Sequence, residues 1–294
     1  MCGFIGFTGI IDRREDVIRK MAERIIHRGP NSGGFHYSGE NDNDSVTLGF
    51  RRLSIIDLSD GSQPMYNEDG SVVIVFNGEI YNFMDLRDEL IAKGHIFKTH
   101  CDTEVIIHGY EEWGKKIAEK LRGMFAFVIW DKKTNVLYGA RDPFGIKPFY
   151  YTKVKSGLIF GSEIKSFLEH PDYKPEVNEN ALRPYLTFQY SSLEETFFKG
   201  VFKLPPAHYF TYRGGKMEKT RYFDFDFTRK TSLSYDECAD MIDKRVHESV
   251  AAHRISDVKV GSFLSGGVDS SYITAVLMPN DTFSVGFNYE KFDE

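Results

Sequence analysis

The chain has 294 residues, of which 41% are hydrophobic, 15% aromatic and 27% charged, and 37 Lys and Arg against 43 Asp and Glu give a net charge of -6. This composition is typical of a globular protein with one large domain or two, and it excludes a disordered chain. No apolar run approaches the roughly 18 residues that a membrane-spanning helix needs, and no export signal opens the chain. We therefore expect a cytoplasmic protein with no membrane partner.

The scattered charges and the distribution of cysteine and histidine exclude further classes. Lys and Arg form no basic face, so nucleic acid is not an expected partner. The three cysteines, an odd and widely spaced set, are typical of a reducing compartment. The nine histidines show no HxH or HExxH spacing, so no zinc motif is present.

The first two hundred residues are rich in predicted strands. An apolar strand over 2–8 precedes a helix whose apolar face ends near His27. Further strands are predicted over 45–50, 72–76, 125–130, 136–140 and 158–161, with hairpin turns at 69–70 and 133–135. Helices are predicted over 82–93, which Gly94 stops, and over 103–113. Antiparallel strands separated by helices favour sheets sandwiched between helical layers.

The pattern changes after Tyr212, and we predict a linker over 213–231 between a first domain, 2–212, and a second, 232–294. Ser234 followed by Glu237 is a capping-box pattern at the start of a helix. A strand over 258–264, a loop over 265–269, a helix over 270–277 and a strand over 282–287 then predict the opening of a parallel sheet. About sixty residues cannot bury both faces of such a sheet, so we expect this domain to be incomplete.

Cys2 is the first candidate for chemistry, because removal of Met1 would leave a thiol and an α-amine on one residue. An α-amine with a pKa of about 7.7–8.0 can accept the thiol proton near neutral pH. The residue alone also fits a second interpretation, an ordinary cysteine that packs as a small hydrophobe.

Three more features can be interpreted from the residues alone. Asn77-Gly78 has the composition of a turn after a strand. Strand alternation places Arg51 and Arg52 on opposite faces, so one of them can enter a pocket while the other is a surface residue. Asp102 is the N-cap of the following helix, a site residue, or both.

Eight segments occur in a recognisable order. They are Cys2-Gly3-Phe4-Ile5-Gly6, His27-Arg28-Gly29-Pro30, Arg52-Leu53-Ser54-Ile55, Asn77-Gly78-Glu79-Ile80-Tyr81-Asn82, Cys101-Asp102-Thr103-Glu104, Gly123-Met124-Phe125-Ala126-Phe127, Arg141-Asp142-Pro143-Phe144-Gly145-Ile146-Lys147-Pro148 and Ser162-Glu163-Ile164-Lys165. Together they resemble the class II glutamine amidotransferases, whose nucleophile is an N-terminal cysteine, and specifically the glutamine-dependent asparagine synthetases. The resemblance runs along the whole chain. Asn31 departs from the family, where Asp is usual, and this change would soften a local salt bridge.

The resemblance implies an α+β fold and a role for each matching residue. The fold would be the four-layer αββα sandwich of N-terminal-nucleophile hydrolases, followed by the truncated start of an α/β ATP-pyrophosphatase-like domain. Cys2 would be the nucleophile, and the Asn77 side chain with the Gly78 N–H would form the oxyanion hole. Arg52 would bind the α-carboxylate of glutamine. Its α-ammonium would be bound by Glu79 and Asp102.

The glycine-rich segment 265–271 lies between a predicted strand and helix, where backbone N–H groups can bind phosphate. A flexible turn is the alternative. The segment resembles the pyrophosphate loop of ATP pyrophosphatases and differs from a GxxxxGK[ST] loop. The implied ATP-binding residues are Leu264, Ser265, Gly266, Gly267, Asp269, Ser270 and Val285. In a complete synthetase domain, Asp269 would also help to hold Mg²⁺.

The resemblance implies two coupled reactions on the small molecules glutamine, aspartate and ATP. Glutamine would give glutamate and ammonia without a cofactor, and ammonia would convert β-aspartyl-AMP into asparagine, with AMP and pyrophosphate released. Because the family's second glycine-rich loop is absent, we expect glutamine hydrolysis without asparagine formation. A homodimer is suggested by analogy alone. Alternatives are an amidotransferase with another carboxylate acceptor, a self-processing hydrolase with another substrate, and a non-enzymatic module of the same fold.

Overall fold

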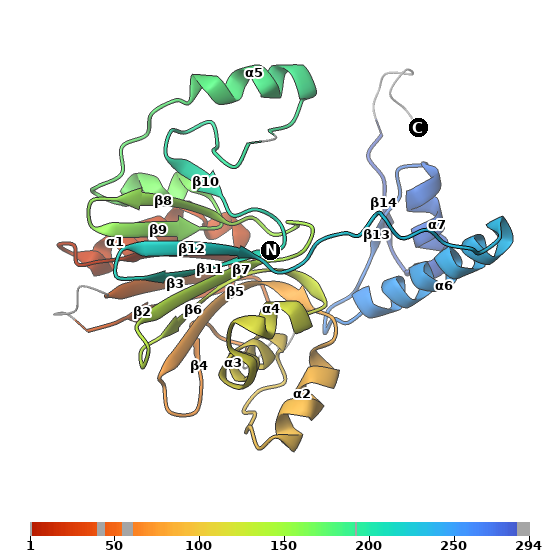
Figure 1. Ribbon diagram of the computed structural model, residues 1–294, viewed down its shortest axis with the longest axis horizontal. Helices are drawn as coiled ribbons and strands as arrows, with labels where there is room; N and C mark the ends of the chain where they lie inside the picture. The colour runs from red at the N-terminus through yellow and green to blue at the C-terminus, as the bar shows by residue number, and fades with distance from the viewer. Residues whose placement is uncertain (1, 40–44, 55–60, 192, 287–294) are drawn as a thin grey trace. The chain divides into compact units, whose positions relative to one another are not determined.

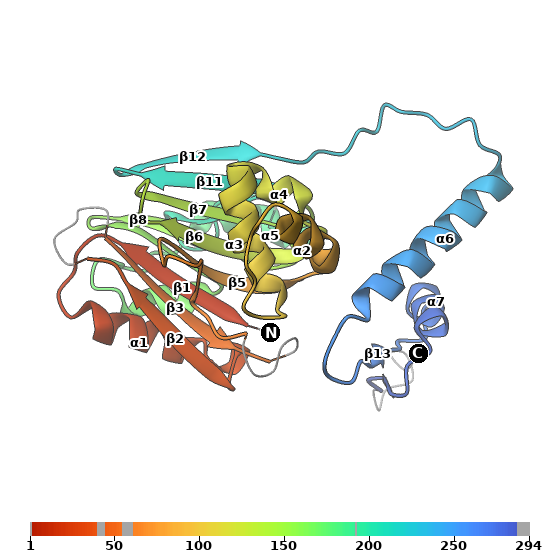
Figure 2. The ribbon, with the colours of Figure 1, turned by 90° about the horizontal axis from the view of Figure 1, so that it is seen from below.

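A computed structural model of the protein describes residues 2–39, 45–54, 61–191 and 193–286 (Figures 1 and 2). The contacts within the chain divide it into two units, Met1–Asp224 and Phe225–Glu294. Each unit is described by itself. Among the described residues, the structure contains no helix that is both long and apolar enough to cross a membrane.

Two antiparallel sheets of six strands each form the centre of the first unit. One sheet has the order β10-β8-β9-β1-β3-β2, and the other has the order β12-β11-β7-β6-β5-β4. The strands of the first sheet are β1 (Gly3–Thr8), β2 (Ser32–Tyr37), β3 (Val46–Arg52), β8 (Tyr150–Val154), β9 (Gly157–Gly161) and β10 (Val201–Lys203). Those of the second sheet are β4 (Met65–Tyr66), β5 (Val72–Ile80), β6 (Gly123–Asp131), β7 (Val136–Arg141), β11 (His208–Arg213) and β12 (Lys216–Arg221).

Helices cover the outer faces of the two sheets, as Figure 2 shows for α1 beside β1–β3 and for α3 and α4 beside the second sheet. The α-helices of this unit are α1 (Arg14–Arg24), α2 (Phe83–Ala92), α3 (Asp102–Trp113), α4 (Ile117–Lys120) and α5 (Glu179–Phe188). Three short 3₁₀ turns are η1 (Ile26–Arg28), η2 (Gly114–Lys116) and η3 (Ile164–Glu169). The predicted four-layer αββα sandwich of the α+β class is confirmed.

Alternation along the strands separates the apolar side chains into three buried clusters. In β5, Val73 and Val75 face the core between the sheets, whereas Ile74 and Phe76 face the layer of α2 and α3. The same alternation in β1 directs Phe4 into the core between the sheets and its neighbours towards α1. The side-chain direction of every other residue on these strands follows from this period of two.

Several predicted boundaries differ from the structure. The strand predicted over 72–76 continues to Ile80, because β5 stays paired with β6 through Asn77 and Gly78, so the interpretation of this pair as a turn is wrong. Helix α3 begins at Asp102 itself, with Cys101 at the N-cap, so Asp102 is not the capping residue. Six strands of the two sheets were not predicted, namely β2, β4, β8, β10, β11 and β12.

Part of the segment that the sequence places in a linker belongs instead to the second sheet. Residues Lys216–Arg221 form β12, which pairs with β11 across a tight turn. Gly214 and Gly215 both have positive φ in this turn, a combination that suits glycine and joins antiparallel strands. Apart from this strand, the division into 2–212, 213–231 and 232–294 stays a prediction.

The second unit contains two helices and a short pair of parallel strands. These elements are α6 (Tyr235–His253), β13 (Ser262–Phe263), α7 (Val268–Leu277) and β14 (Thr282–Phe283). The predicted capping box is present, because the Ser234 N–H donates to Glu237 Oε2 at 2.8 Å and the Glu237 N–H donates to Ser234 Oγ at 3.3 Å. The β-loop-α-β order is confirmed, although both strands are shorter than predicted and residue 287 lies outside the described residues.

Candidate active site

Polar side chains from both sheets meet where the apolar core between the sheets ends. Cys2 lies two residues before Phe4 of β1, so the two side chains point to the same side of the sheet. Arg52 lies two residues after Phe50 on β3 and likewise points to the same side as Phe50. Along β5, Asn77 and Glu79 continue the inward row of Val73 and Val75. Because side chains alternate, all four polar residues point towards the space between the sheets.

The choice between Arg51 and Arg52 is settled by this alternation. Arg51 points to the other side of its sheet, where its Nε donates to the carbonyl of Ala22 in α1 at 3.3 Å. Arg52 is 7% exposed and lines a cavity together with Cys2. Arg52 is therefore the arginine that can meet a substrate at this end of the sandwich.

This cavity has a volume of about 40 Å³ and collects most of the predicted glutamine-site residues. Its lining is Cys2, Arg52, Leu53, Gly61, Gln63, Phe76, Gly78, Glu79, Cys101, Asp102 and Thr103. Asn77 is not part of this lining and is almost completely buried in β5. Five of the six predicted residues thus share one cavity, and the sixth lies beside Gly78 in the sequence.

The thiol and the backbone of Cys2 are both held in place. The thiol donates to the Leu53 carbonyl at 3.4 Å, and the Leu53 N–H donates to Sγ at 3.3 Å. The Cys2 carbonyl accepts from Arg28 Nε at 2.9 Å, and Arg28 also pairs with Glu163 at 3.0 Å. Burial raises the pKa of the Cys2 thiol, which the Leu53 N–H opposes. A base is therefore needed to form the thiolate near neutral pH.

Two N–H groups of β5 are suited to stabilise an oxyanion. The buried Asn77 Nδ2 has no hydrogen-bond partner among the residues that the structure describes. The N–H groups of Phe76 and Ile80 donate to Gln63 Oε1 and Asp102 Oδ2, away from β6. Since alternate residues of an antiparallel ladder share one direction, the Gly78 N–H points to this same edge of the strand.

Glycine at position 78 is required by the sheet itself. A Cβ there would lie 2.3 Å from the Met124 carbonyl oxygen and 2.8 Å from Phe125 Cα in β6. The absence of a side chain at Gly78 therefore lets β6 pack closely against β5 at this point. The sequence alone did not reveal this constraint.

Two carboxyl groups, the half-buried Glu79 and the buried Asp102, line this cavity together. Burial raises the pKa of both, and the charge of Asp102 raises the pKa of Glu79 further. The charge of Lys147 lowers the pKa of Glu79. The Ile80 N–H donates to Asp102 at 2.9 Å, and this hydrogen bond lowers the pKa of Asp102. Two carboxyl groups at one wall of a cavity favour the binding of a cation.

Sequence reasoning missed the role of three residues around this cavity. Lys147 is 3% exposed, and its loop wraps around the Asp142 carboxylate, which accepts from the Lys147 N–H at 3.0 Å. Gln63 joins β5 to α3 through the Phe76 N–H and Thr103 Oγ1. Arg28 fixes the Cys2 backbone. Lys147 and Arg28 belong to two of the eight segments that carry the resemblance, but the spacing of those segments does not assign a function to either residue.

Asn31 takes part in a hydrogen bond near the cavity. Its Oδ1 accepts from the Ser54 N–H at 3.2 Å. The preceding residues His27 and Arg28 both contact Glu163, at 2.9 and 3.0 Å. These contacts do not involve residue 31.

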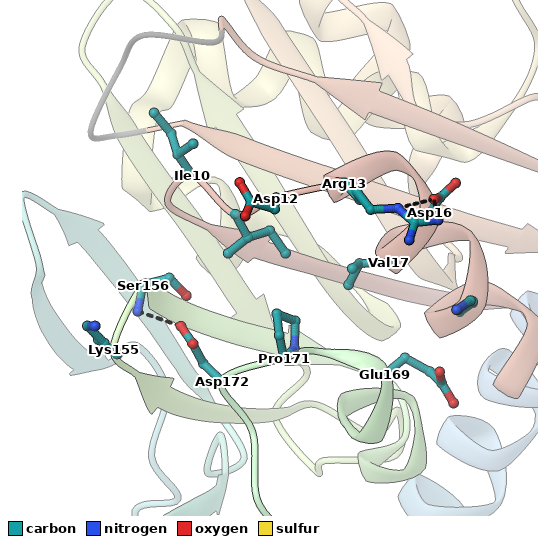
Figure 3. A pocket seen from close by; sticks show the side chains of 12 residues that line it. Ile10, Asp12, Arg13, Asp16, Val17, Lys155, Ser156, Glu169, Pro171 and Asp172 are labelled. Carbon is teal, nitrogen blue, oxygen red and sulfur yellow. Dashed lines mark hydrogen bonds and ion pairs between the residues drawn. The ribbon is translucent and has the colours of Figure 1, made fainter.

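A second cavity of the first unit, of about 590 Å³, contains none of the predicted site residues in its lining (Figure 3). Its lining begins at Ile10, beyond the end of β1 opposite to Cys2, and continues into α1. The other side is formed by Lys155 and Ser156 in the β8–β9 turn and by residues at and after the end of η3. Its charged groups are partly paired, as Arg13 with Asp16 and the Ser156 N–H with Asp172. It offers no counterpart to the nucleophile and donors at Cys2.

In the second unit, the predicted ATP-binding residues gather around the start of α7. Ser265 Oγ and Ser270 Oγ lie 3.1 Å apart, and Ser270 Oγ donates to the Gly267 carbonyl at 3.0 Å. Gly266 has a φ of +85°, which favours glycine. Asp269 lies in the first turn of α7, and Leu264 and Val285 follow the neighbouring parallel strands β13 and β14.

Comparison with known proteins gives the family. The model of the glutamine amidotransferase domain family matches residues 1–223, and the asparagine synthase model matches residues 241–294. The chain belongs to the glutamine amidotransferase domain family. Asparagine synthetase [glutamine-hydrolyzing] 1 of Bacillus subtilis (strain 168) is 43% identical over 304 residues, which cover 100% of this chain and 47% of the relative.

A second relative agrees with this assignment, and a solved structure is similar in fold. Asparagine synthetase [glutamine-hydrolyzing] 3 of the same bacterium is 37% identical over 316 residues, covering 100% of this chain and 49% of the relative. The chain spans about half the length of the curated relatives it matches. The structure of glutamine phosphoribosylpyrophosphate amidotransferase from B. subtilis is similar in fold, with a TM-score of 0.56, 15% identity, and coverage of 100% of this chain and 68% of that one.

Proposed function

We propose that this amidotransferase chain hydrolyses glutamine to glutamate and ammonia, as the glutaminase part of an asparagine synthetase. The observation that supports this most strongly is that Cys2, Arg52, Gly78, Glu79 and Asp102 line one cavity at the end of the sandwich. A nucleophile, a cationic group and two carboxyl groups there match the side-chain amide, α-carboxylate and α-ammonium of glutamine.

In the proposed reaction, removal of Met1 exposes the α-amine of Cys2, which accepts the thiol proton. The thiolate attacks the side-chain carbonyl of glutamine, and the negative oxygen is stabilised by Asn77 Nδ2 and the Gly78 N–H. The C–N bond breaks, the leaving nitrogen takes a proton and departs as ammonia, and a glutamyl thioester is left on Cys2. Water then attacks the thioester, which releases glutamate and restores the thiol.

Substrate binding in this proposal follows from charge. The guanidinium of Arg52 binds the α-carboxylate through paired hydrogen bonds. Glu79 and Asp102 bind the α-ammonium, whose positive charge relieves the repulsion between them. Arg28 and Lys147 are positioning residues, because Arg28 holds the Cys2 backbone and the charge of Lys147 acts on Glu79.

The proposal for the second unit is narrower. Within a whole synthetase, Leu264, Val285 and the loop from Ser265 to Ser270 bind ATP, which supplies the adenylate that activates aspartate for attack by ammonia. Asp269 is an oxygen ligand of the type that Mg²⁺ prefers, at the start of a helix beside a glycine-rich loop. A homodimer and a cytoplasmic location belong to the same proposal, and the three free cysteines suit the latter.

The test is glutamate release from glutamine by the purified chain, alongside Cys2→Ala. We expect release by the parent and none above background by the variant. Cys238→Ala in α6 is the matched control, since it removes a cysteine from the second unit and leaves the cavity unchanged. Intact mass must first show that Met1 is removed. Equal release by the parent and Cys2→Ala, or no release by the processed parent, contradicts the proposal.

A further inference from the structure

Four potential metal ligands from separate segments meet on the outer side of the second sheet, away from the residues that line the Cys2 cavity. They are Glu68, from the turn between β4 and β5, His95, from the loop between α2 and α3, and His108 and Glu111, from α3. One ligand atom of each lies within 4.8 Å of the others. Histidine and glutamate residues this far apart in sequence form no HxH or HExxH motif, so the sequence did not predict the cluster.

Glu111 is at the centre of this group. Its Oε2 lies 3.0 Å from His108 Nδ1 and 4.0 Å from His95 Nδ1, and His108 Nδ1 lies 3.7 Å from Glu68 Oε1. Donors around a tetrahedral zinc ion, with bonds of about 2.0–2.1 Å, are about 3.4 Å apart. The Glu68 side chain is 36% exposed, so it can move to close the remaining distance.

Each histidine has its second ring nitrogen beside a different carboxylate. His108 Nε2 lies 3.6 Å from Glu104 Oε1, and His95 Nε2 lies 3.5 Å from Glu112 Oε2. This carboxylate–histidine arrangement is typical of metal centres, where it orients the ring and makes the ligating nitrogen more basic. It occurs twice here, with both Nδ1 atoms directed at Glu111.

Two of the four ligands, Glu111 and His108, are also held from outside the cluster. The second oxygen of Glu111 accepts from Asn67 Nδ2 at 2.6 Å. Phe97 packs its ring edge-on against His108, with the ring centroids 4.6 Å apart, and His108 itself is 1% exposed. One side of the group is therefore dry and preorganised, and the Glu68 side is open for entry.

We propose that Glu68, His95, His108 and Glu111 bind a divalent transition-metal ion of the zinc type as a structural site. Two imidazoles with two carboxylates suit zinc and its substitute cobalt, whereas calcium and magnesium prefer oxygen ligands throughout. Two carboxylates also balance the charge of one divalent ion.

The site would join α3 to two neighbouring segments. His108 is six residues after Asp102 on α3, about 9 Å along the axis at 1.5 Å per residue. Glu104, which faces His108, also accepts from the Lys98 and Thr99 N–H groups at 2.8 Å in the loop that leads to Asp102. A bound ion would therefore fix the helix that carries Asp102 against the β4–β5 turn.

The experiment is titration of the chelator-treated full chain with Co²⁺, followed by displacement with Zn²⁺. We expect one Co²⁺ per chain with the intense visible absorption of a four-coordinate centre, its loss on adding Zn²⁺, and a higher thermal unfolding temperature with Zn²⁺. The ligand variants His95→Gln and Glu111→Gln should weaken binding by more than about 100-fold. Glu112 contacts the ligand His95 and would not bind the ion itself, so Glu112→Gln should weaken binding by about 10–100-fold.

His247→Gln is the matched control, because His247 lies 3.7 Å from Asp243 in α6 and forms part of no such cluster among the described residues. It should leave Co²⁺ binding unchanged. Circular dichroism of the metal-free variants shows whether they fold. The proposal is overturned if the folded parent binds no Co²⁺ or Zn²⁺, or if folded His95→Gln and Glu111→Gln bind them as the parent does.

Discussion

The two units of this chain differ in what holds them together. The first unit has three clusters of buried apolar side chains, one between the sheets and one under each helical layer. In the second unit, no apolar side chain of the described residues is buried, and Phe263, Val268 and Val285 are 78–85% exposed. Its helices and strands are held by hydrogen bonds, among them the capping box of α6, the pairing of β13 with β14 and the bond from Tyr272 in α7 to Asp243 in α6. Secondary structure alone therefore does not make a domain core.

The largest expected effect of this difference is on stability. Phe127 is completely buried between β6 and α3, so Phe127→Ala should lower the free energy of unfolding of the first unit by about 3–5 kcal/mol. The matched change in the second unit, Phe263→Ala, should alter stability by less than about 0.5 kcal/mol. Urea denaturation followed by fluorescence measures both. Equal losses in the two variants would mean that Phe263 is covered in solution.

The next effect concerns the site of the first unit. Asn77→Ala should lower kcat for glutamine hydrolysis by about 10²–10³-fold, because it removes one oxyanion donor. Stability should change little, since Asn77 Nδ2 has no partner in the folded protein among the described residues. Steady-state kinetics and a denaturation curve on the same preparation give both values. A rise in KM with unchanged kcat would argue for a role in binding the ground state instead.

The carboxyl groups of Glu79 and Asp102 should make stability depend on pH, and we expect this effect to be intermediate in magnitude. Burial raises the pKa of both groups above their ordinary values near about 4, and the charge of Asp102 raises the pKa of Glu79 further. The folded state therefore binds these protons more tightly than the unfolded chain does. The resulting stability is fully present below about pH 4 and is lost as pH rises through the raised pKa values.

Asp102→Asn removes one of the two charges and should flatten this loss between pH 5 and 8, measured as the urea midpoint without glutamine. The matched control is Asp172→Asn, because the hydrogen bond from Ser156 lowers the pKa of Asp172. This control should shift the midpoint without changing its slope over that pH range. A parent midpoint that stays constant from pH 5 to 8 would show that the pair does not titrate there.

Much of the fold and of the site could be predicted from the sequence, for identifiable reasons. The central strands and α3 have strong apolar patterns, and the alternation of Arg51 and Arg52 on one strand limited the pocket to one of them. Short edge strands such as β4 and β12 were missed because their residues are partly polar and their pairing is set by the neighbouring strand. The length of β5 was underestimated because Asn77-Gly78 has the composition of a turn.

The residues that sequence analysis could not assign act through contacts between distant segments. Arg28 reaches the Cys2 carbonyl across 26 positions, and Gln63 connects β5 to α3. The cluster around Glu111 likewise joins three segments without a spacing motif. Such contacts depend on the packing of the sheets and helices, which a single sequence does not specify.

The smallest expected effect is at the capping box of α6. Ser234→Ala removes the acceptor of the Glu237 N–H, and a lost N-cap of this kind costs about 0.5–2 kcal/mol. Because the described residues of this unit bury no apolar side chain that would hold the helix, the loss should appear as faster hydrogen exchange in the first turn of α6. Ser249→Ala, in the interior of the same helix, should leave that turn unchanged or slow its exchange, since alanine favours helix. If both variants exchange as the parent does, tertiary contacts rather than the cap hold α6, and the second unit is more like the first than its exposed side chains indicate.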